Sequence, residues 1–222
     1  MVVSFTLKDN RSIQLLAVDI QVIFNLFICI ADILGDKQSY GIGLSSLIDA
    51  GFHFQKVSKE NSIIPDVNVY QVTGTEFNNP APVLRNKNTT FHTCVLSRCN
   101  VGEQGRIMRN TWSPTGLCTH VFIFTNGDIL LWRDPTVEKG QMAGLYNSHA
   151  LEALIEDESH RVSKQQIDTL WKWIQHYNDT DSSIDVTNLL THSEARGSGR
   201  NGQIDNIDEM RRIMGLGNSR IS

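Results

Sequence analysis

The sequence predicts an α/β domain with a mixed central β-sheet flanked by helices, preceded by a small α+β unit. Three observations support this prediction: apolar runs of strand length, a capped amphipathic helix in the carboxyl-terminal half, and an order of strands and helices that does not alternate strictly. The chain has 222 residues, of which 40% are hydrophobic and 20% charged, as is typical of a globular protein with a sizeable core.

The small amino-terminal unit is expected to span residues 1–75. Its first part, VVSFTLKDNRSIQLLAV, alternates in polarity and predicts a hairpin that turns at Asp9 and Asn10. Residues 20–34 are apolar but shorter than the roughly 20 residues of a membrane-spanning helix. We therefore expect a largely buried helix and no membrane span. Residues 56–82 are polar and proline-bearing, and are interpreted as a connector to the larger domain, residues 83–215.

Charge and cysteine content exclude some functions. The net charge is -4 and no basic cluster is present, so the sequence gives no indication of a nucleic-acid partner. The amino terminus lacks the basic region and cleavage site of a signal peptide. The 4 cysteines do not form Cys-x-x-Cys pairs, which argues against a zinc knuckle, and they are interpreted as reduced. They are Cys29, Cys94, Cys99 and Cys118.

The larger domain begins with signals for strands and a hairpin. Residues 88–96 predict a strand, and residues 101–112 fit a helix with one apolar side. The clearest local signal is residues 119–132, where two apolar runs flank Asn126-Gly127, a pair that favours a type I′ hairpin turn. Residues 150–155 fit either a short strand or a helical turn.

A capped helix follows at residues 163–177. Ser163 has the position of an N-cap, and Gln166, three residues later, completes a capping box. Trp173 is expected at a partly exposed rim of this helix. The residues that recur at i, i+3, i+4 and i+7, and are expected on its buried face, are Ile167, Leu170, Trp171 and Ile174.

Histidines are the candidate ligands of a metal site, and the chain has 7 of them. Hydrolytic zinc sites use three protein ligands and keep one position open for water. His92 is expected at the end of one strand and His192 at the end of the final predicted strand, so the two meet if these strands are neighbours. A hydrogen-bonded structural role fits such histidines too, and His120 is interpreted in this way. Glu194 fits either a carboxylate that orients His192 or a solvated side chain.

The order of these motifs resembles the type 2 N-acetylmuramoyl-L-alanine amidases, whose fold is shared by phage lysozymes of the amidase kind and by the peptidoglycan recognition proteins. The resemblance covers residues 83–215. HVFIFTNGDI is similar to the family's hairpin segment, and YNSHALEALI stands where the family has N-x-x-S-I-G-I-E. The VSKQQIDTLWKWI helix and THSEARG follow in the family's order.

This resemblance implies a zinc-dependent hydrolase that cleaves the amide bond between N-acetylmuramic acid and L-alanine in peptidoglycan. The family's zinc histidines end the first and last core strands, which implies His92 and His192 as metal ligands. The third ligand is an Asp or Cys some residues later, which implies Asp205; Cys94 is a poorer candidate. A zinc ion at such a site lowers the pKa of its bound water toward about 7 and polarises the scissile carbonyl.

The family's catalytic auxiliaries are not matched here. Leu154 stands where the family has a glutamate, Thr119 where it has a tyrosine, and Gln203 where it has a lysine. The neighbouring ionisable residues are therefore the candidate catalytic groups, and two residues at the family's ligand-contacting position are candidates for a substrate cleft. The catalytic candidates are Glu152, Glu156 and Arg200, and the cleft candidates are Asn147 and His149.

Two hypotheses from different classes follow. In the first, the chain is a phage-related, bacteriolytic peptidoglycan amidase whose amino-terminal unit docks to the wall or to other phage structural proteins. In the second, the amidase fold serves as a structural or peptidoglycan-binding component of a phage tail or baseplate. The histidine pair favours the enzyme, and the missing auxiliaries favour the scaffold. Either protein acts at the bacterial cell wall or within a virion. A third interpretation is an unrelated α/β domain whose motifs match by chance.

Overall fold

The computed structural model of the chain describes residues 2–6, 12–16, 42–49, 51–75, 83–99, 119–141, 143–156, 159–197 and 203–220. The chain divides into two compact units, Met1–Tyr40 and Gly41–Ser222, each of which is described by itself. In the first unit, β1 (Val2–Thr6) pairs antiparallel with β2 (Ser12–Leu16), which confirms the strand pairing of the expected hairpin. Its turn and the apolar run 20–34 lie outside the described residues.

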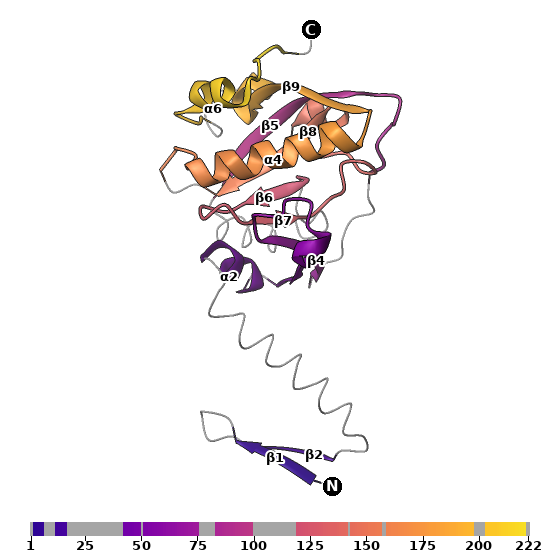
Figure 1. Cartoon of the computed structure of the whole chain (residues 1–222), viewed down its shortest axis with the longest axis vertical. Helices are drawn as coiled ribbons and strands as arrows, with labels where there is room; N and C mark the ends of the chain where they lie inside the picture. Colours follow the sequence, from indigo (N-terminus) through magenta and orange to yellow (C-terminus); the bar gives the residue numbers. More distant parts are fainter. Residues whose placement is uncertain are drawn as a thin grey trace. The chain divides into compact units, whose positions relative to one another are not determined.

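The second unit is built on a mixed sheet of seven strands in the order β3-β4-β7-β6-β8-β5-β9 (Figure 1). The strands β6, β8, β5 and β9 run parallel, whereas β3 is antiparallel to β4 and β7 is antiparallel to β6. This sheet confirms the predicted fold class. The strand bounds are β3 Phe52–Lys56, β4 Val69–Thr75, β5 Phe91–Cys99, β6 Val121–Ile123, β7 Ile129–Leu131, β8 Ala150–Glu156 and β9 Ile184–Thr191.

The boundary between the two units lies earlier than the sequence suggests. It falls between Tyr40 and Gly41, whereas the expected boundary followed residue 75. The polar stretch interpreted as a connector contains η1 (Lys59–Asn61) and β4, and β4 pairs with β7 in the sheet. A helix, α2 (Ile42–Asp49), precedes β3. Pairing to a distant strand therefore makes a polar segment part of the domain.

Helices cover both faces of the sheet. On one face, α4 (Lys164–Thr180) lies across β5, β6 and β8, and α6 (Ile207–Met214) lies beside β9 (Figure 1). Because side chains alternate along a strand, Val95 and Leu190 point away from α4. They form a second, smaller apolar cluster with η2 (Gly144–Ser148) and α5 (His192–Arg196). The sheet is therefore buried between two apolar layers.

The capping box of α4 is confirmed. The Ser163 hydroxyl accepts the Gln166 N–H at 3.2 Å, and the Gln166 side chain accepts the Ser163 N–H at 2.9 Å. The positions expected for the two tryptophans are reversed, because Trp173 is fully buried and Trp171 is partly exposed. Trp173 packs edge-on against Tyr177, with ring centroids 5.7 Å apart. The buried face of α4 is thus centred nearer to Trp173 than the apolar stripe indicates.

The β6–β7 hairpin forms as predicted, but with a different turn. A type I′ turn needs positive φ at both central residues. Here Gly127 has φ +86, but Asn126 has negative φ, because His160 is the single described non-glycine residue with positive φ. The Gly127 N–H donates to the Phe124 carbonyl at 2.9 Å, which matches a three-residue loop closed by a left-handed glycine. The Asn126 side chain accepts the Asp128 N–H at 3.0 Å and stabilises this three-residue loop.

The substitution Gly127→Ala is expected to lower the free energy of unfolding by about 1–3 kcal/mol, measured by urea denaturation. A Cβ at this position meets both the left-handed φ and Gln165, whose Cβ would lie 2.9 Å away. Gly197→Ala is the matched control, because Gly197 has φ +69 with no atom within 4 Å of an added Cβ. An equal loss in both variants contradicts the steric part of this explanation.

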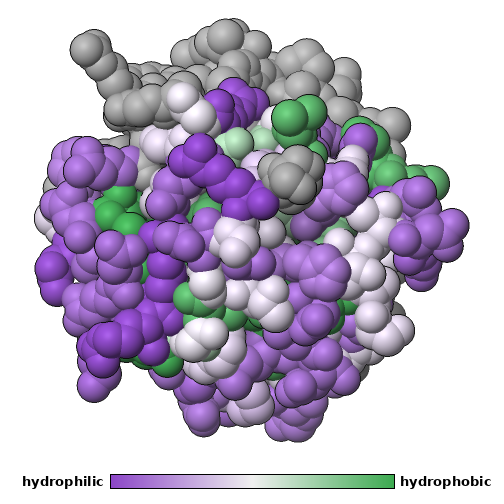
Figure 2. Space-filling view, turned by 90° about the horizontal axis from the view of Figure 1, so that it is seen from above, coloured by the Kyte–Doolittle hydropathy of each residue, from purple (hydrophilic) through white to green (hydrophobic). Residues whose placement is uncertain are grey.

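The face of the molecule seen in Figure 2 is mainly hydrophilic, and its hydrophobic residues appear in small separate areas. Within the described part of the chain, no helix combines the length and the apolar character needed to cross a membrane.

Candidate functional site at the carboxyl edge of the parallel strands

The carboxyl ends of β6, β8, β5 and β9 meet at one edge of the sheet, the usual place for a ligand site in an open α/β sheet. β9 ends at Thr191, within one residue of the predicted end of the final strand, and His192 follows as the first residue of α5. The Thr191 hydroxyl accepts the Glu194 N–H at 3.2 Å, and the Glu194 carboxylate accepts the Thr191 N–H at 2.7 Å. This capping box fixes the backbone that carries His192.

Glu194 has neither of the roles expected from the sequence. Its Oε2 lies 2.6 Å from the Arg211 guanidinium, which also donates to the Leu189 carbonyl at 3.0 Å. Burial opposes ionisation of Glu194, but the hydrogen bonds from Arg211 and Thr191 outweigh it and hold its pKa below the usual value. The carboxylate therefore joins α5 to α6 and to the end of β9.

His92 does not lie at this edge. It is the second residue of β5, which continues to Cys99, and its Nδ1 lies 3.1 Å from the Asp185 carbonyl oxygen at the start of β9. In the register, Thr93 pairs with Asn188, so His92 precedes this pair by one residue and His192 follows it by four. Five strand positions correspond to about 16 Å, whereas two nitrogens on one tetrahedral zinc ion lie only about 3.3 Å apart. The structure does not bring these two histidines together.

The same register shows which residue stands beside His192. Leu96 pairs with Thr191, so the next position of β5, Ser97, is level with His192. Ser97 is buried and cannot provide an imidazole. The sequence misses this position because the strand extends beyond the run of Thr, Phe and Val that predicted it. The apolar run CVL ends before Ser97, so no local pattern marks this position.

Asp205 does reach the carboxyl edge of the sheet. Its N–H donates to the His160 carbonyl at 2.9 Å, and Arg98, near the end of β5, donates to the Gln203 carbonyl at 2.6 Å and contacts the His160 ring. Arg200 lies outside the described residues. In the described part of the chain, no three His, Cys, Asp or Glu side chains are close enough to hold a metal ion. These residues therefore do not fit the three-ligand zinc site that the resemblance implies.

The two glutamates proposed as catalytic are buried on β8, which resolves the strand-or-turn alternative in favour of a strand. The backbone of Gly140 packs against the Glu152 carboxyl group and leaves no room for a Cβ, and the Ala143 N–H donates to Glu152 at 3.3 Å. Glu156 accepts the Thr125 N–H at 3.0 Å. Both carboxylates therefore have structural roles, because they hold the backbone of neighbouring loops against β8.

His120 has the structural role expected for it. It is fully buried, its Nδ1 accepts the Glu152 N–H at 2.9 Å, and its Nε2 faces the Glu138 carbonyl at 3.2 Å. Burial lowers its pKa to about 4, so the ring is neutral at physiological pH. Thr119, which stands where the family has a tyrosine, is also buried and donates to the Val121 carbonyl at 3.1 Å.

The two predicted cleft residues lie on the face of the sheet opposite α4. Asn147 belongs to η2, which contacts α5, and His149 follows η2 directly. Leu145, on η2, is 92% exposed, and the Arg196 guanidinium of α5 lies beside Gly144. The residues Leu145, Asn147, His149, His192 and Arg196 define the η2–α5 surface. The side-chain oxygen of Asn147 is buried there, with no hydrogen-bond partner among the described residues.

No protein-family model and no curated protein matches the chain. It is similar to solved structures, and each of the following three has a TM-score of 0.52. The amidase LysC from Clostridium intestinale is 18% identical, with 67% of this chain and 98% of that one covered. Drosophila peptidoglycan recognition protein SD is 13% identical, with coverages of 66% and 93%. Peptidoglycan recognition protein LE, solved in complex with tracheal cytotoxin, is 10% identical, with coverages of 64% and 92%.

These similarities cover most of each solved structure, but at identities that establish only a shared architecture. They agree with the mixed sheet and its flanking helices. The chain therefore has the fold of the N-acetylmuramoyl-L-alanine amidases and the peptidoglycan recognition proteins.

Proposed function

We propose that this chain is a peptidoglycan-binding protein that uses the amidase fold for recognition. The register of β5 and β9 carries the proposal, because it sets a serine rather than a histidine level with His192. A binding protein needs the shape and polar groups of the fold but not its complete metal site. One solved relative in fold, recognition protein LE, binds a monomeric peptidoglycan of the diaminopimelic acid type.

The η2–α5 surface has the chemistry that such a ligand needs. Peptidoglycan stem peptides carry carboxylates and amides, and Arg196 is suited to bind a carboxylate through two parallel hydrogen bonds. The buried side-chain oxygen of Asn147 is suited to accept a ligand N–H, since a buried polar atom without a partner costs free energy until it is paired. The exposed Leu145 offers an apolar contact for a peptide methyl group.

Co-sedimentation of the full chain with purified insoluble peptidoglycan tests this proposal. We expect the wild type to bind, and the double variant Leu145→Ser, Arg196→Ala to bind about tenfold more weakly, a loss of roughly 1.4 kcal/mol. Ile213→Ser is the matched control. Ile213 is 51% exposed on α6, and α6 packs on the face of the sheet opposite the η2–α5 surface. Equal binding by wild type, double variant and control rejects the η2–α5 surface as the binding site.

The hydrolase is the second candidate, and the position of His192 at the carboxyl edge favours it. The same wall preparation distinguishes the two, by measuring free amino groups of L-alanine released with time. Release that is lost in His192→Ala establishes the amidase. Binding without release, unchanged by a chelator, is the result expected here.

A docking role for the amino-terminal unit, on a bacterial wall or a phage particle, belongs to the same proposal. It is supported by the division of the chain into two compact units, Met1–Tyr40 and Gly41–Ser222. Deletion of residues 1–40 is expected to leave peptidoglycan binding by the sheet domain unchanged and to remove attachment to a particle.

A further inference from the structure

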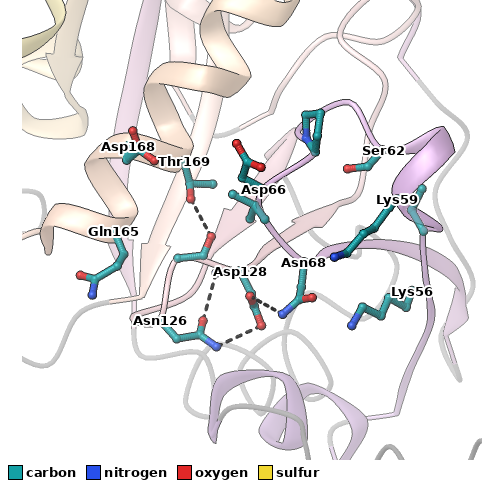
Figure 3. A pocket seen from close by; sticks show the side chains of 14 residues that line it. Lys56, Lys59, Ser62, Asp66, Asn68, Asn126, Asp128, Gln165, Asp168 and Thr169 are labelled. Atoms are coloured by element: carbon teal, nitrogen blue, oxygen red, sulfur yellow. Dashed lines mark hydrogen bonds between the residues drawn. The ribbon is translucent and has the colours of Figure 1, made fainter.

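A polar cavity of about 440 Å³ lies on the α4 side of the sheet (Figure 3). It is bounded by the end of β3, η1, the loop before β4, the β6–β7 turn and the first turns of α4. The η2–α5 surface lies on the other face of the sheet, so this cavity is not part of the surface proposed above. Its volume is within the usual range for small-molecule sites.

One side of the cavity is positively charged. Lys56, at the end of β3, and Lys59, on η1, both line it, and Figure 3 shows their side chains extending from the same side. Neither ammonium group forms an ion pair with a residue in the described ranges. Two unpaired cations at one wall favour the binding of an anionic group there.

The α4 side of the cavity carries negative charge. Asp168 lies opposite the two lysines in Figure 3, and Lys172 lies 3.0 Å from it and 3.8 Å from Asp66. The hydrogen bond with Asp168 raises the pKa of Lys172, so this lysine stays charged. One ammonium group thus faces two carboxylates, which leaves a net negative charge on this side.

The floor of the cavity is held by hydrogen bonds. The buried Asp128 accepts side-chain N–H groups from Asn68 and from Asn126, each at 3.0 Å. The Thr169 hydroxyl donates to the Gly127 carbonyl at 2.7 Å and joins α4 to the turn. The floor is therefore preformed, and it lies between the lysines on one side and Asp168 on the other.

We infer that this cavity binds a small zwitterion, such as a free amino acid or a dipeptide with uncapped ends. The ligand carboxylate lies toward Lys56 and Lys59, and its ammonium group toward Asp168 and Asp66. A ligand with only a negative charge would be repelled by Asp168 and Asp66. A ligand with only a positive charge would be repelled by the two lysines. Only a ligand with both charges complements both sides.

Isothermal titration of the full chain with glycylglycine tests the inference. We expect saturable binding in the millimolar range, and at least about tenfold weaker binding of N-acetylglycylglycine and of glycylglycinamide, because each lacks one charge. No saturable binding of glycylglycine overturns the inference. Equal affinity for either capped probe overturns it as well, since the two charges then do not determine recognition.

Variants assign each charge of the ligand to its side of the cavity. Lys56→Met with Lys59→Met is expected to weaken glycylglycine about tenfold and to leave glycylglycinamide unchanged. Asp168→Asn is expected to weaken glycylglycine but not the N-acetylated probe. Lys164→Met is the control, because Lys164 is exposed on the first turn of α4 and does not line the cavity. Weakening by Lys164→Met equal to that of the double variant shows a general charge effect and overturns the assignment.

Discussion

Arg85→Met is expected to lower the free energy of unfolding by about 3–5 kcal/mol, because it removes a cation with a completely buried side chain from a site built around it. The guanidinium donates to the Pro135 carbonyl at 3.0 Å and to the Thr89 carbonyl at 3.1 Å. It also donates to the Ser183 hydroxyl at 2.9 Å. These acceptors belong to three segments that are distant in sequence.

A methionine leaves these buried acceptors unpaired while filling a similar volume, so the loss comes from polar groups rather than from a void. The Arg85 guanidinium carbon also lies 3.8 Å from the centre of the Phe91 ring, and this cation–π attraction is lost with the charge.

Urea denaturation of Arg85→Met beside Arg161→Met measures this effect. Arg161 pairs with Glu209 at 2.8 Å, but its side chain is 62% exposed, so its replacement is expected to cost less than about 1 kcal/mol. A loss in Arg85→Met no larger than in Arg161→Met contradicts the role assigned to the buried arginine.

Acidification is expected to remove about 3 kcal/mol of stability through His120. Burial lowers the pKa of this histidine from 6.5 to about 4 in the folded chain. Below pH 6.5 the unfolded chain therefore binds a proton that the folded chain does not. The stabilising contribution is complete above pH 6.5 and is lost as the pH falls to about 4. The hydrogen bond from the Glu152 N–H also opposes protonation of the folded-state ring, because a protonated Nδ1 cannot accept it.

The measurement is the free energy of unfolding at a series of pH values between 4 and 7. His120→Gln is expected to be less stable than wild type near pH 7 and to show a flatter dependence on pH in this window, because its amide does not titrate. His53→Gln is the control, since His53 is exposed on β3. A pH dependence that is unchanged in His120→Gln excludes this histidine as the source.

Local features of the fold were predictable because they depend on neighbouring residues. The capping box of Ser163 and Gln166 and the strand that ends before His192 follow from short sequence patterns. The turn at Gly127 was only half predictable. Its glycine is needed for positive φ, but the turn type depends on the hydrogen bond between Asn126 and Asp128.

The candidate site was less predictable, because it depends on distances that no local pattern contains. His92 lies on β5 and His192 directly follows β9, but they are at opposite ends of the β5–β9 pair. Similarly, Trp173 rather than Trp171 is buried, because the packing of α4 on the sheet selects the face that is covered.

By itself, the sequence determined the fold class, the capped helix, the central hairpin and the strand that leads to His192, because backbone preferences and apolar periodicity act over a few residues. Only the tertiary structure decided that Ser97 stands level with His192, that β3 and β4 complete the sheet, and that Lys56 and Lys59 face Asp168 across a cavity. Alternation shows which residues share a face of a strand. The register with the neighbouring strand fixes how far along that face each residue lies, and it is set by packing across the whole sheet.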